Sequence, residues 1–259
     1  MRIKPVLPSL SALSLFALSL LTLSVLPAGP AHANLIVNGG FEQTTNGGNK
    51  QLAATAAAAA GTTNRTTLTG WTSSNGNDGG YNFVLNGATA ATTASALRLR
   101  GDNNGFGAAP DGGNFFASDP LYYPGTLSQT VYGLSVGASY LLTFDYALAQ
   151  QSGYSGVNTA DYWQVGFGKD IQSTVPMNLA DGAFSGWQSA SMRFTATGAS
   201  QVLSFLAKGS TPGAPPFMLL DGVALNASTS VPEPSTLSLL LGGIGVAGLA
   251  AWRRRRRQA

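Results

Sequence analysis

The stretch Tyr140-Leu141-Leu142-Thr143-Phe144-Asp145-Tyr146-Ala147-Leu148 places Leu142, Phe144 and Tyr146 on one face of an extended chain. A period of two is the pattern of a strand with one face in the core. The same period returns in other short segments bounded by glycine turns, which are 35–37, 81–85, 97–100, 113–117, 126–132, 163–167, 187–196, 201–207 and 217–225. About nine or ten short strands without helices between them predict an all-β fold, an antiparallel β-sandwich.

One segment departs from this pattern. The alanine run 53–60 lies in a stretch rich in Thr, Gly and Asn and has no apolar stripe. We therefore predict a long loop over 43–69, with a short helix as the alternative.

The N-terminus is typical of a secretory signal peptide, residues 1–33. Arg2 and Lys4 precede an uncharged run over 10–26, and Ala31-His32-Ala33 forms a cleavage site before Asn34. An uncleaved membrane anchor is the alternative, but the proline and glycine breakers before the site favour cleavage between Ala33 and Asn34. Cleavage removes the only histidine of the chain.

The C-terminus has three consecutive parts. A linker, 227–234, contains Pro232-Glu233-Pro234 and is followed by the uncharged segment 235–252. At about 1.5 Å per residue this segment spans roughly 27 Å as a helix, so we predict a transmembrane helix. The arginines that follow hold the tail, 253–259, in the cytoplasm by the positive-inside rule; they are Arg253, Arg254, Arg255, Arg256 and Arg257.

This tail resembles the PEP-CTERM sorting signal in the order and spacing of all three parts. The resemblance implies that an exosortase-like membrane transpeptidase of a Gram-negative bacterium recognises Pro232, Glu233 and Pro234. It also implies a transient single-pass anchor in the inner membrane. An ordinary single-pass anchor is the alternative, but it needs no such motif beside its helix.

The charges separate the two ends from the middle of the chain. Of 14 basic and 11 acidic residues, the middle region 34–230 holds 7 basic and 10 acidic ones, a net charge of −3. The overall charge of +3 therefore does not indicate nucleic-acid binding. The chain has no cysteine, and the middle region has no histidine. These absences exclude Ser-His-Asp, Cys-His and Cys- or His-ligated zinc mechanisms, whereas a pair of carboxylates remains open.

The middle region, 34–226, resembles galactose-binding-like jelly rolls. The segments that carry the resemblance are 34–42, Gly70-Trp71, 126–131, 140–147 and 217–223. The resemblance implies a structural Ca²⁺ held by Glu42 and Asp221, with backbone carbonyls completing the six to eight oxygens that calcium takes. The alternative is that both carboxylates accept backbone N–H bonds.

Aromatic residues in or beside loops rich in Gly, Asn and Asp are candidates for stacking on sugars. The main candidates are Trp71, Tyr81, Tyr122 and Tyr123; Tyr154, Tyr162 and Trp163 also lie in such surroundings. Trp163 and Trp187 fit strand patterns and are expected in the core. Pro120 and Pro124 bracket Tyr122 and Tyr123, which favours their exposure.

Together these features predict a non-catalytic, glycan-binding protein that is exported and sorted by an exosortase. Its destination would be the cell surface or the exopolysaccharide of a biofilm matrix. A structural matrix protein that self-associates through strand edges is one alternative. A carboxylate-based enzyme acting on glycans is the other.

Overall fold

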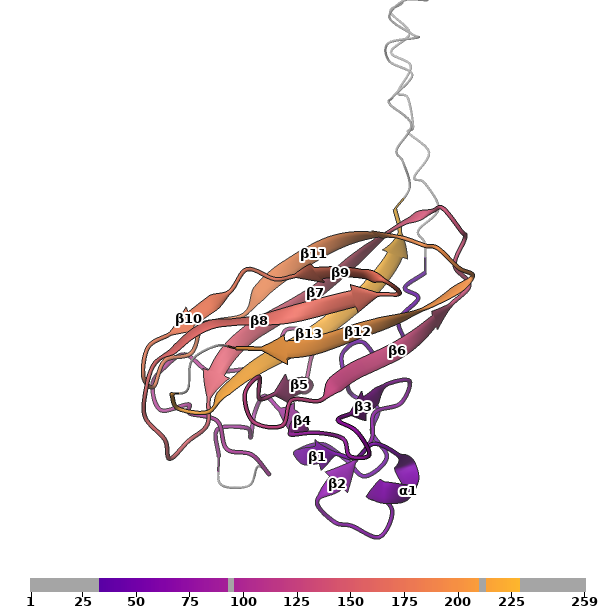
Figure 1. Ribbon diagram of the computed structural model, residues 1–259. Coiled ribbons are helices and arrows are strands. Elements are labelled where there is room, and N and C mark those ends of the chain that lie inside the picture. The colour runs from indigo at the N-terminus through magenta and orange to yellow at the C-terminus, as the bar shows by residue number, and fades with distance from the viewer. Residues whose placement is uncertain (1–32, 93–95, 210–212, 229–259) are drawn as a thin grey trace, which may run out of the picture. The chain divides into compact units, whose positions relative to one another are not determined.

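The computed structural model describes residues 33–92, 96–209 and 213–228 (Figure 1). The predicted transmembrane helix, the Pro-Glu-Pro motif, the arginine cluster and nearly all of the signal peptide lie outside these residues. In the described part no helix is long and apolar enough to cross a membrane.

The described residues form thirteen strands and one short helix. They are β1 (Lys50–Leu52), α1 (Ala56–Ala59), β2 (Arg65–Thr66), β3 (Thr72–Ser74), β4 (Asn82–Asn86), β5 (Asn114–Ser118), β6 (Thr126–Tyr132), β7 (Ser139–Gln150), β8 (Asn158–Phe167), β9 (Asp170–Ser173), β10 (Met177–Leu179), β11 (Gln188–Thr195), β12 (Ser200–Lys208) and β13 (Pro216–Ala227).

The strands make two sheets, which Figure 1 shows lying one behind the other. One sheet has the order β11-β7-β13-β5-β4-β1-β2 and the other β10-β8-β12-β6-β3, with β9 paired to β8. Every named pair is antiparallel except β1 with β2. The prediction of an all-β antiparallel sandwich is thus confirmed.

The main core lies between the two sheets. Trp163 is fully buried there, and its Nε1 donates to the backbone oxygen of Leu219 in the opposite sheet at 3.0 Å. Its ring lies 5.8 Å from that of Phe116, which belongs to β5. The expectation that Trp163 is a core residue is confirmed. Its indole bonds one sheet to the other as well as filling space.

A second apolar cluster covers the outer face of the seven-stranded sheet. Phe115, Phe217 and Leu219 from the sheet pack there with Leu97 and Leu99 from the long segment between β4 and β5. This second layer explains why the C-terminal half of β7 and the start of β13 are buried on both faces. Trp187, half-buried, packs against the same cluster.

Two predicted strands are absent, and the long loop predicted over 43–69 contains the short helix that was its alternative. Leu97–Arg100 does bury its leucines, but it forms only one bridge, between Leu99 and Gln151, and no strand. Leu35–Val37 is not a strand either. The Gln129 side chain accepts from the N–H of Val37 and donates to its C=O, so these backbone groups bond to a side chain instead of a neighbouring strand. The segment 43–69 contains β1, β2 and the alternative short helix, whose first turn is capped by Thr55.

Candidate functional site

A surface pocket of about 370 Å³ brings together three of the four main sugar-binding candidates. Its lining residues are Gln51, Asp78, Tyr81, Tyr122 and Tyr123. Gln51 comes from β1, Asp78 and Tyr81 from the connection between β3 and β4, and the other two from the turn between β5 and β6. We call this the tyrosine pocket.

The turn that carries Tyr122 and Tyr123 is fixed by the Asp119 side chain and by a backbone bond to Tyr81. Oδ1 of Asp119 accepts the N–H groups of Leu121 at 2.8 Å and of Tyr122 at 2.9 Å. The carbonyl of Tyr123 accepts the N–H of Tyr81 at 2.9 Å, which ties the turn to the start of β4. The two turn tyrosines are 66% and 51% exposed. A rigid turn therefore presents two aromatic rings to solvent, as a preorganised binding site requires.

Tyr81 forms the half-buried side of the pocket. Its ring makes edge-to-face contacts with Tyr122 at 5.1 Å and with Phe83 at 4.8 Å between centroids. Burial, followed by the Asp119 carboxylate, raises the pKa of Tyr81, and a hydrogen bond from the Gln151 side chain opposes this. The phenol is therefore neutral at pH 7, with its ring held in place by neighbours on both sides.

The polar groups of the pocket offer acceptors. Oδ1 of Asp78 accepts from Arg65 at 3.1 Å and from the Gly79 N–H at 2.7 Å. The Asp78 side chain is 45% exposed, so its second oxygen can accept from a ligand. Nε2 of Gln51 donates to the Gly80 carbonyl at 2.9 Å, which leaves its Oε1 as an acceptor.

Trp71, the fourth candidate, belongs to the core. It is 6% exposed, it packs against Phe41 and Phe205, and its Nε1 donates to the Asn38 carbonyl at 3.0 Å. Sugar stacking on Trp71 was therefore a wrong expectation. The glycine turn before it marks where the chain enters the sandwich, and a glycine neighbour does not by itself indicate exposure.

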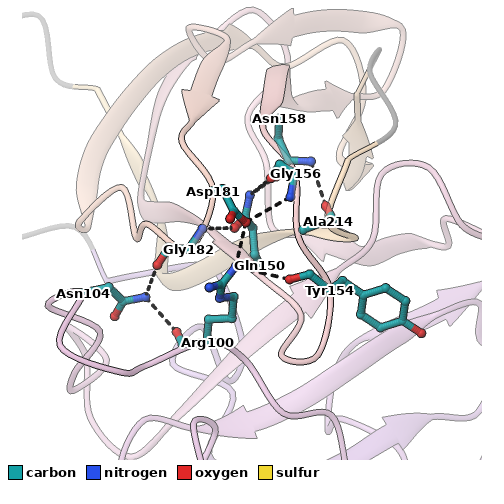
Figure 2. A network of polar contacts seen from close by, with 9 residues as sticks. All are labelled: Arg100, Asn104, Gln150, Tyr154, Gly156, Asn158, Asp181, Gly182 and Ala214. Atoms are coloured by element: carbon teal, nitrogen blue, oxygen red, sulfur yellow. Dashed lines mark hydrogen bonds and ion pairs between the residues drawn. The ribbon is translucent and has the colours of Figure 1, made fainter.

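A buried polar network joins the loops at the end of the sandwich where β7 ends and β8 begins (Figure 2). Nε2 of Gln150 donates to Oδ1 of Asn158 at 2.6 Å and to the Gly156 carbonyl at 2.8 Å, while Oε1 of Gln150 accepts the Gly182 N–H at 2.7 Å. Asn158 in turn donates to the Ala214 carbonyl at 2.8 Å. Four separate chain segments are thereby held together through two amide side chains.

The network continues to the surface through an ion pair. Arg100 lies 2.7 Å from Asp181 and also donates to the Tyr154 carbonyl at 3.2 Å. The Gly156 N–H, and after it Arg100, lowers the pKa of the exposed Asp181. Figure 2 shows the Tyr154 ring directed away from the network. Sequence reasoning missed this network because its partners stand as far as 81 residues apart.

Glu42 and Asp221 both anchor the loop that leads into β5. Oε1 of Glu42 accepts the Asn114 N–H at 2.6 Å, and Oδ2 of Asp221 accepts the Asp111 N–H at 2.8 Å. Oδ1 of Asp221 accepts the Gly222 N–H at 2.8 Å. This is the alternative that the sequence left open for these two carboxylates.

The surroundings of Asp221 bear on whether it could hold calcium. Burial is the main cause that raises the pKa of Asp221 to about 7, and the Asp111 and Asp145 carboxylates raise it further. A cation would relieve that cost. Yet both oxygens of Asp221 already accept N–H bonds, and within 33–92, 96–209 and 213–228 no three His, Cys, Asp or Glu side chains are grouped to hold a metal ion. The hydrogen bonds of Glu42 and Asp221 therefore support the alternative role of these carboxylates as acceptors for backbone N–H groups. Calcium binding by the two residues is an untested prediction.

Comparison with solved structures finds sugar-binding proteins, among them carbohydrate-binding modules. One is TmCBM61 in complex with β-1,4-galactotriose, with 17% identity over 76% of this chain and 99% of that chain and a TM-score of 0.41. Another is a CBM4 structure, with 13% identity over 74% and 99% of the two chains and a TM-score of 0.32. A third is the EclA C-terminal domain, a sugar-binding protein, with 23% identity over 42% and 68% and a TM-score of 0.29. With TM-scores this low, these likenesses carry no inference about ligand or activity.

The tail gives a more specific result. Residues 230–256 match the family model of the PEP-CTERM protein-sorting motif. Such a motif implies export, membrane-anchored sorting and processing by an exosortase, a membrane enzyme. No curated protein sequence matches the chain. The chain is thus a β-sandwich protein that carries a PEP-CTERM sorting motif at its C-terminus.

Proposed function

We propose that the β-sandwich is a non-catalytic carbohydrate-binding module, and that the tyrosine pocket is its polysaccharide site. The observation that carries this proposal is the gathering of Tyr81, Tyr122 and Tyr123 around two acceptor side chains in one surface pocket. Exposed, rigidly mounted rings offer apolar faces to the C–H faces of a sugar, while polar neighbours fix the orientation of its hydroxyls.

The charge of the pocket selects among polysaccharides. Asp78 and Gln51 present acceptors to a ligand, and the middle region of the chain carries a net charge of −3. A uronic acid or sulfated sugar would be repelled, whereas the hydroxyls of a neutral sugar would donate to these acceptors. The ligand we propose is therefore a neutral polysaccharide.

In the tyrosine pocket, the carboxylates support binding rather than hydrolysis. A glycosidase needs two carboxyl groups about 5 to 9.5 Å apart across the scissile bond. Asp78 is the one carboxylate that lines the tyrosine pocket, and its Oδ1 is held by Arg65. Asp221 has the raised pKa of a general acid, but it is buried and both of its oxygens accept backbone N–H bonds. It has no route to a glycosidic oxygen.

The two ends of the chain determine its destination in this proposal. The signal peptide, 1–33, directs export, and the 235–252 helix anchors the chain transiently in the inner membrane. An exosortase then cleaves beside Pro232-Glu233-Pro234, and the β-sandwich reaches the cell surface or the exopolysaccharide matrix of a Gram-negative bacterium. The sorting motif supports the membrane-anchored stage, and the module then holds the protein to the polysaccharide.

The test is a glycan array followed by titration of the purified protein with the neutral polysaccharide that binds best. Tyr122→Ala and Tyr123→Ala should each weaken binding about tenfold or more, since aromatic side chains that become covered on binding dominate such interfaces. Tyr132→Ala is the matched control, because Tyr132 is 71% exposed on β6 and lines a different pocket. Equal binding by all three variants, or loss only in Tyr132→Ala, would refute the tyrosine pocket.

The structural alternative has a different signature. A protein that only self-associates through strand edges binds no glycan and forms oligomers whose size rises with concentration in sedimentation. A protein that stays monomeric in sedimentation and binds polysaccharide would support the proposed carbohydrate-binding function.

A further inference from the structure

The first and last described segments of the chain lie side by side at one end of the sandwich. The Leu35 N–H donates to the Leu225 carbonyl at 2.9 Å, and Oδ1 of Asn34 accepts the Leu225 N–H at 2.9 Å. Ser228, the last described residue, donates its N–H to the carbonyl of Ser139, which begins β7. Figure 1 shows this end on the side of the sandwich away from β1 and β2. We call it the terminal end.

Exposed apolar side chains gather at the terminal end. Tyr132, the last residue of β6, is 71% exposed, and Val136 in the turn that follows is 69% exposed. Val37 and Val202 are also exposed, and with Tyr132 they line one surface pocket of about 540 Å³. We call these four residues the terminal patch. Exposed apolar residues that gather on one surface, rather than lying singly, indicate a contact with another body.

The turn that carries Val136 is held in place by its neighbour. The Leu134 N–H donates to the Ala199 carbonyl at 3.0 Å, and the Gly137 N–H donates to the Ala196 carbonyl at 2.8 Å. Leu134 is itself buried in the main core. The turn 133–138 is therefore fixed to the turn between β11 and β12, and little conformational entropy is lost when it binds a surface.

The charges at the terminal end differ from those of the middle region as a whole. Lys169 is exposed in the turn between β8 and β9, and Arg193, near the end of β11, donates to the Ser228 hydroxyl. Asp170 follows Lys169, whereas Asp145 and Asp221 lie midway along β7 and β13. The net charge of −3 of the middle region thus lies away from this end, and an anionic surface would not repel it.

The chain beyond the terminal end is short. Six residues, 229–234, separate Ser228 from the segment 235–252, which the sequence predicts to span the membrane. At no more than about 3.6 Å per residue this connection reaches at most about 25 Å. The 12 residues of β7 extend over about 40 Å, so the connection is shorter than the sandwich. In an anchored precursor the terminal end is held near lipid, where the tether strengthens a weak contact.

We propose that the terminal patch rests on the lipid headgroups of the inner membrane while the precursor is anchored. The inference rests on the anchored stage of the proposed function. Tyrosine is favoured where lipid meets water, because its ring is apolar and its hydroxyl is polar. The valines add apolar area, and Lys169 and Arg193 attract anionic headgroups. The short connection and these charges favour lipid over a soluble partner.

This contact sets the direction of the tyrosine pocket. β6 begins at Thr126, just after the turn that carries Tyr122 and Tyr123, and ends at Tyr132 in the terminal patch. The tyrosine pocket and the terminal patch therefore lie toward opposite ends of one strand. With the patch on the bilayer, the pocket is directed away from the membrane, toward the polysaccharide outside.

The experiment compares one fluorophore at each end of the sandwich. The chain has no cysteine, so Val136→Cys and the matched control Val157→Cys can each be labelled at a single site. Val157 is an exposed valine beside the start of β8, whereas the terminal end holds the end of that strand. The full chain is reconstituted into vesicles of phosphatidylethanolamine and phosphatidylglycerol whose headgroups carry a quencher. No sugar is present.

We expect the lipid quencher to reduce the emission at position 136 and to leave the emission at position 157 unchanged. Tyr132→Ala should lessen the quenching at 136, because it removes the exposed ring of the patch. Tyr122→Ala, at the other end of the sandwich, should not change it.

The outcomes separate this proposal from the proposed function. Equal quenching at both positions, in a chain that floats with the vesicles, overturns the membrane contact and leaves the anchored stage standing. A chain that does not float overturns both. Emission at 136 that changes with protein density and not with the quencher would show a second copy on the patch, and would also overturn the proposal.

Discussion

Gln150→Leu is the substitution whose effect the structure defines most closely. Gln150 is fully buried at the end of β7, and leucine is an apolar side chain one atom shorter that lacks both polar atoms. The change removes the three hydrogen bonds that Gln150 makes to Asn158, Gly156 and Gly182. The loops at this end of the sandwich then lose the side chain that joins them.

The expected cost follows from what each former partner can do next. Oδ1 of Asn158 is buried, so it bears the penalty of an unpaired polar atom, about 1–3 kcal/mol. Gly156 and Gly182 are only partly buried, and their backbone groups can turn to water at a cost of about 0.5–1 kcal/mol each. The gain from burying apolar surface offsets part of this sum. We expect Gln150→Leu to lower the free energy of unfolding by about 2–4 kcal/mol.

Urea denaturation followed by tryptophan fluorescence measures this loss. Gln172→Leu is the control, since Gln172 makes a single exposed bond to the Arg193 carbonyl and should change stability by less than about 0.5 kcal/mol. A Gln150→Leu protein as stable as the Gln172→Leu control would show that the network in Figure 2 does not stabilise the fold.

Three further predictions concern the core, pH and sorting. Trp163→Phe keeps an aromatic ring but removes the bond to the buried Leu219 carbonyl, so the unfolding free energy measured in urea should fall by about 1–3 kcal/mol; no change would contradict a bond between the sheets. Burial raises the folded pKa of Asp161 and of Asp221 to about 7, above the unfolded value, so between these values the folded state holds protons that the unfolded state has lost. The free energy of unfolding should therefore fall as pH rises from about 4 to 7 and then level off. Denaturation curves across this range that are flat or rise with pH would contradict the burial of these charges. Replacing Pro232-Glu233-Pro234 with three alanines should leave an uncleaved, membrane-bound precursor in the native host, detected by mass spectrometry of membrane and secreted fractions; normal release would refute exosortase dependence.

The alternation of apolar residues was enough to predict the sandwich. Leu142, Phe144 and Tyr146 are buried as the period of two requires, and Trp163 lies in the core. The local sequence pattern gave a wrong strand prediction where a side chain took the place of a neighbouring strand as hydrogen-bond partner. The apolar Leu35–Val37 segment looks like a strand, but Gln129, 92 residues away, supplies the bonds that a neighbouring strand would have made.

The candidate site was predictable only in part. The prolines around Tyr122 and Tyr123 correctly indicated an exposed turn, because proline at both ends restricts the backbone. Nothing local distinguishes these tyrosines from Trp71, whose burial depends on packing against Phe41 and Phe205.

A crystal structure of the protein with the neutral oligosaccharide that binds best in the glycan array tests the central claim most directly. The account predicts a sugar ring stacked on Tyr122 or Tyr123, with its hydroxyls donating to Asp78 and Gln51. A sugar bound instead beside Tyr132 on β6, with the tyrosine pocket unchanged, would contradict it.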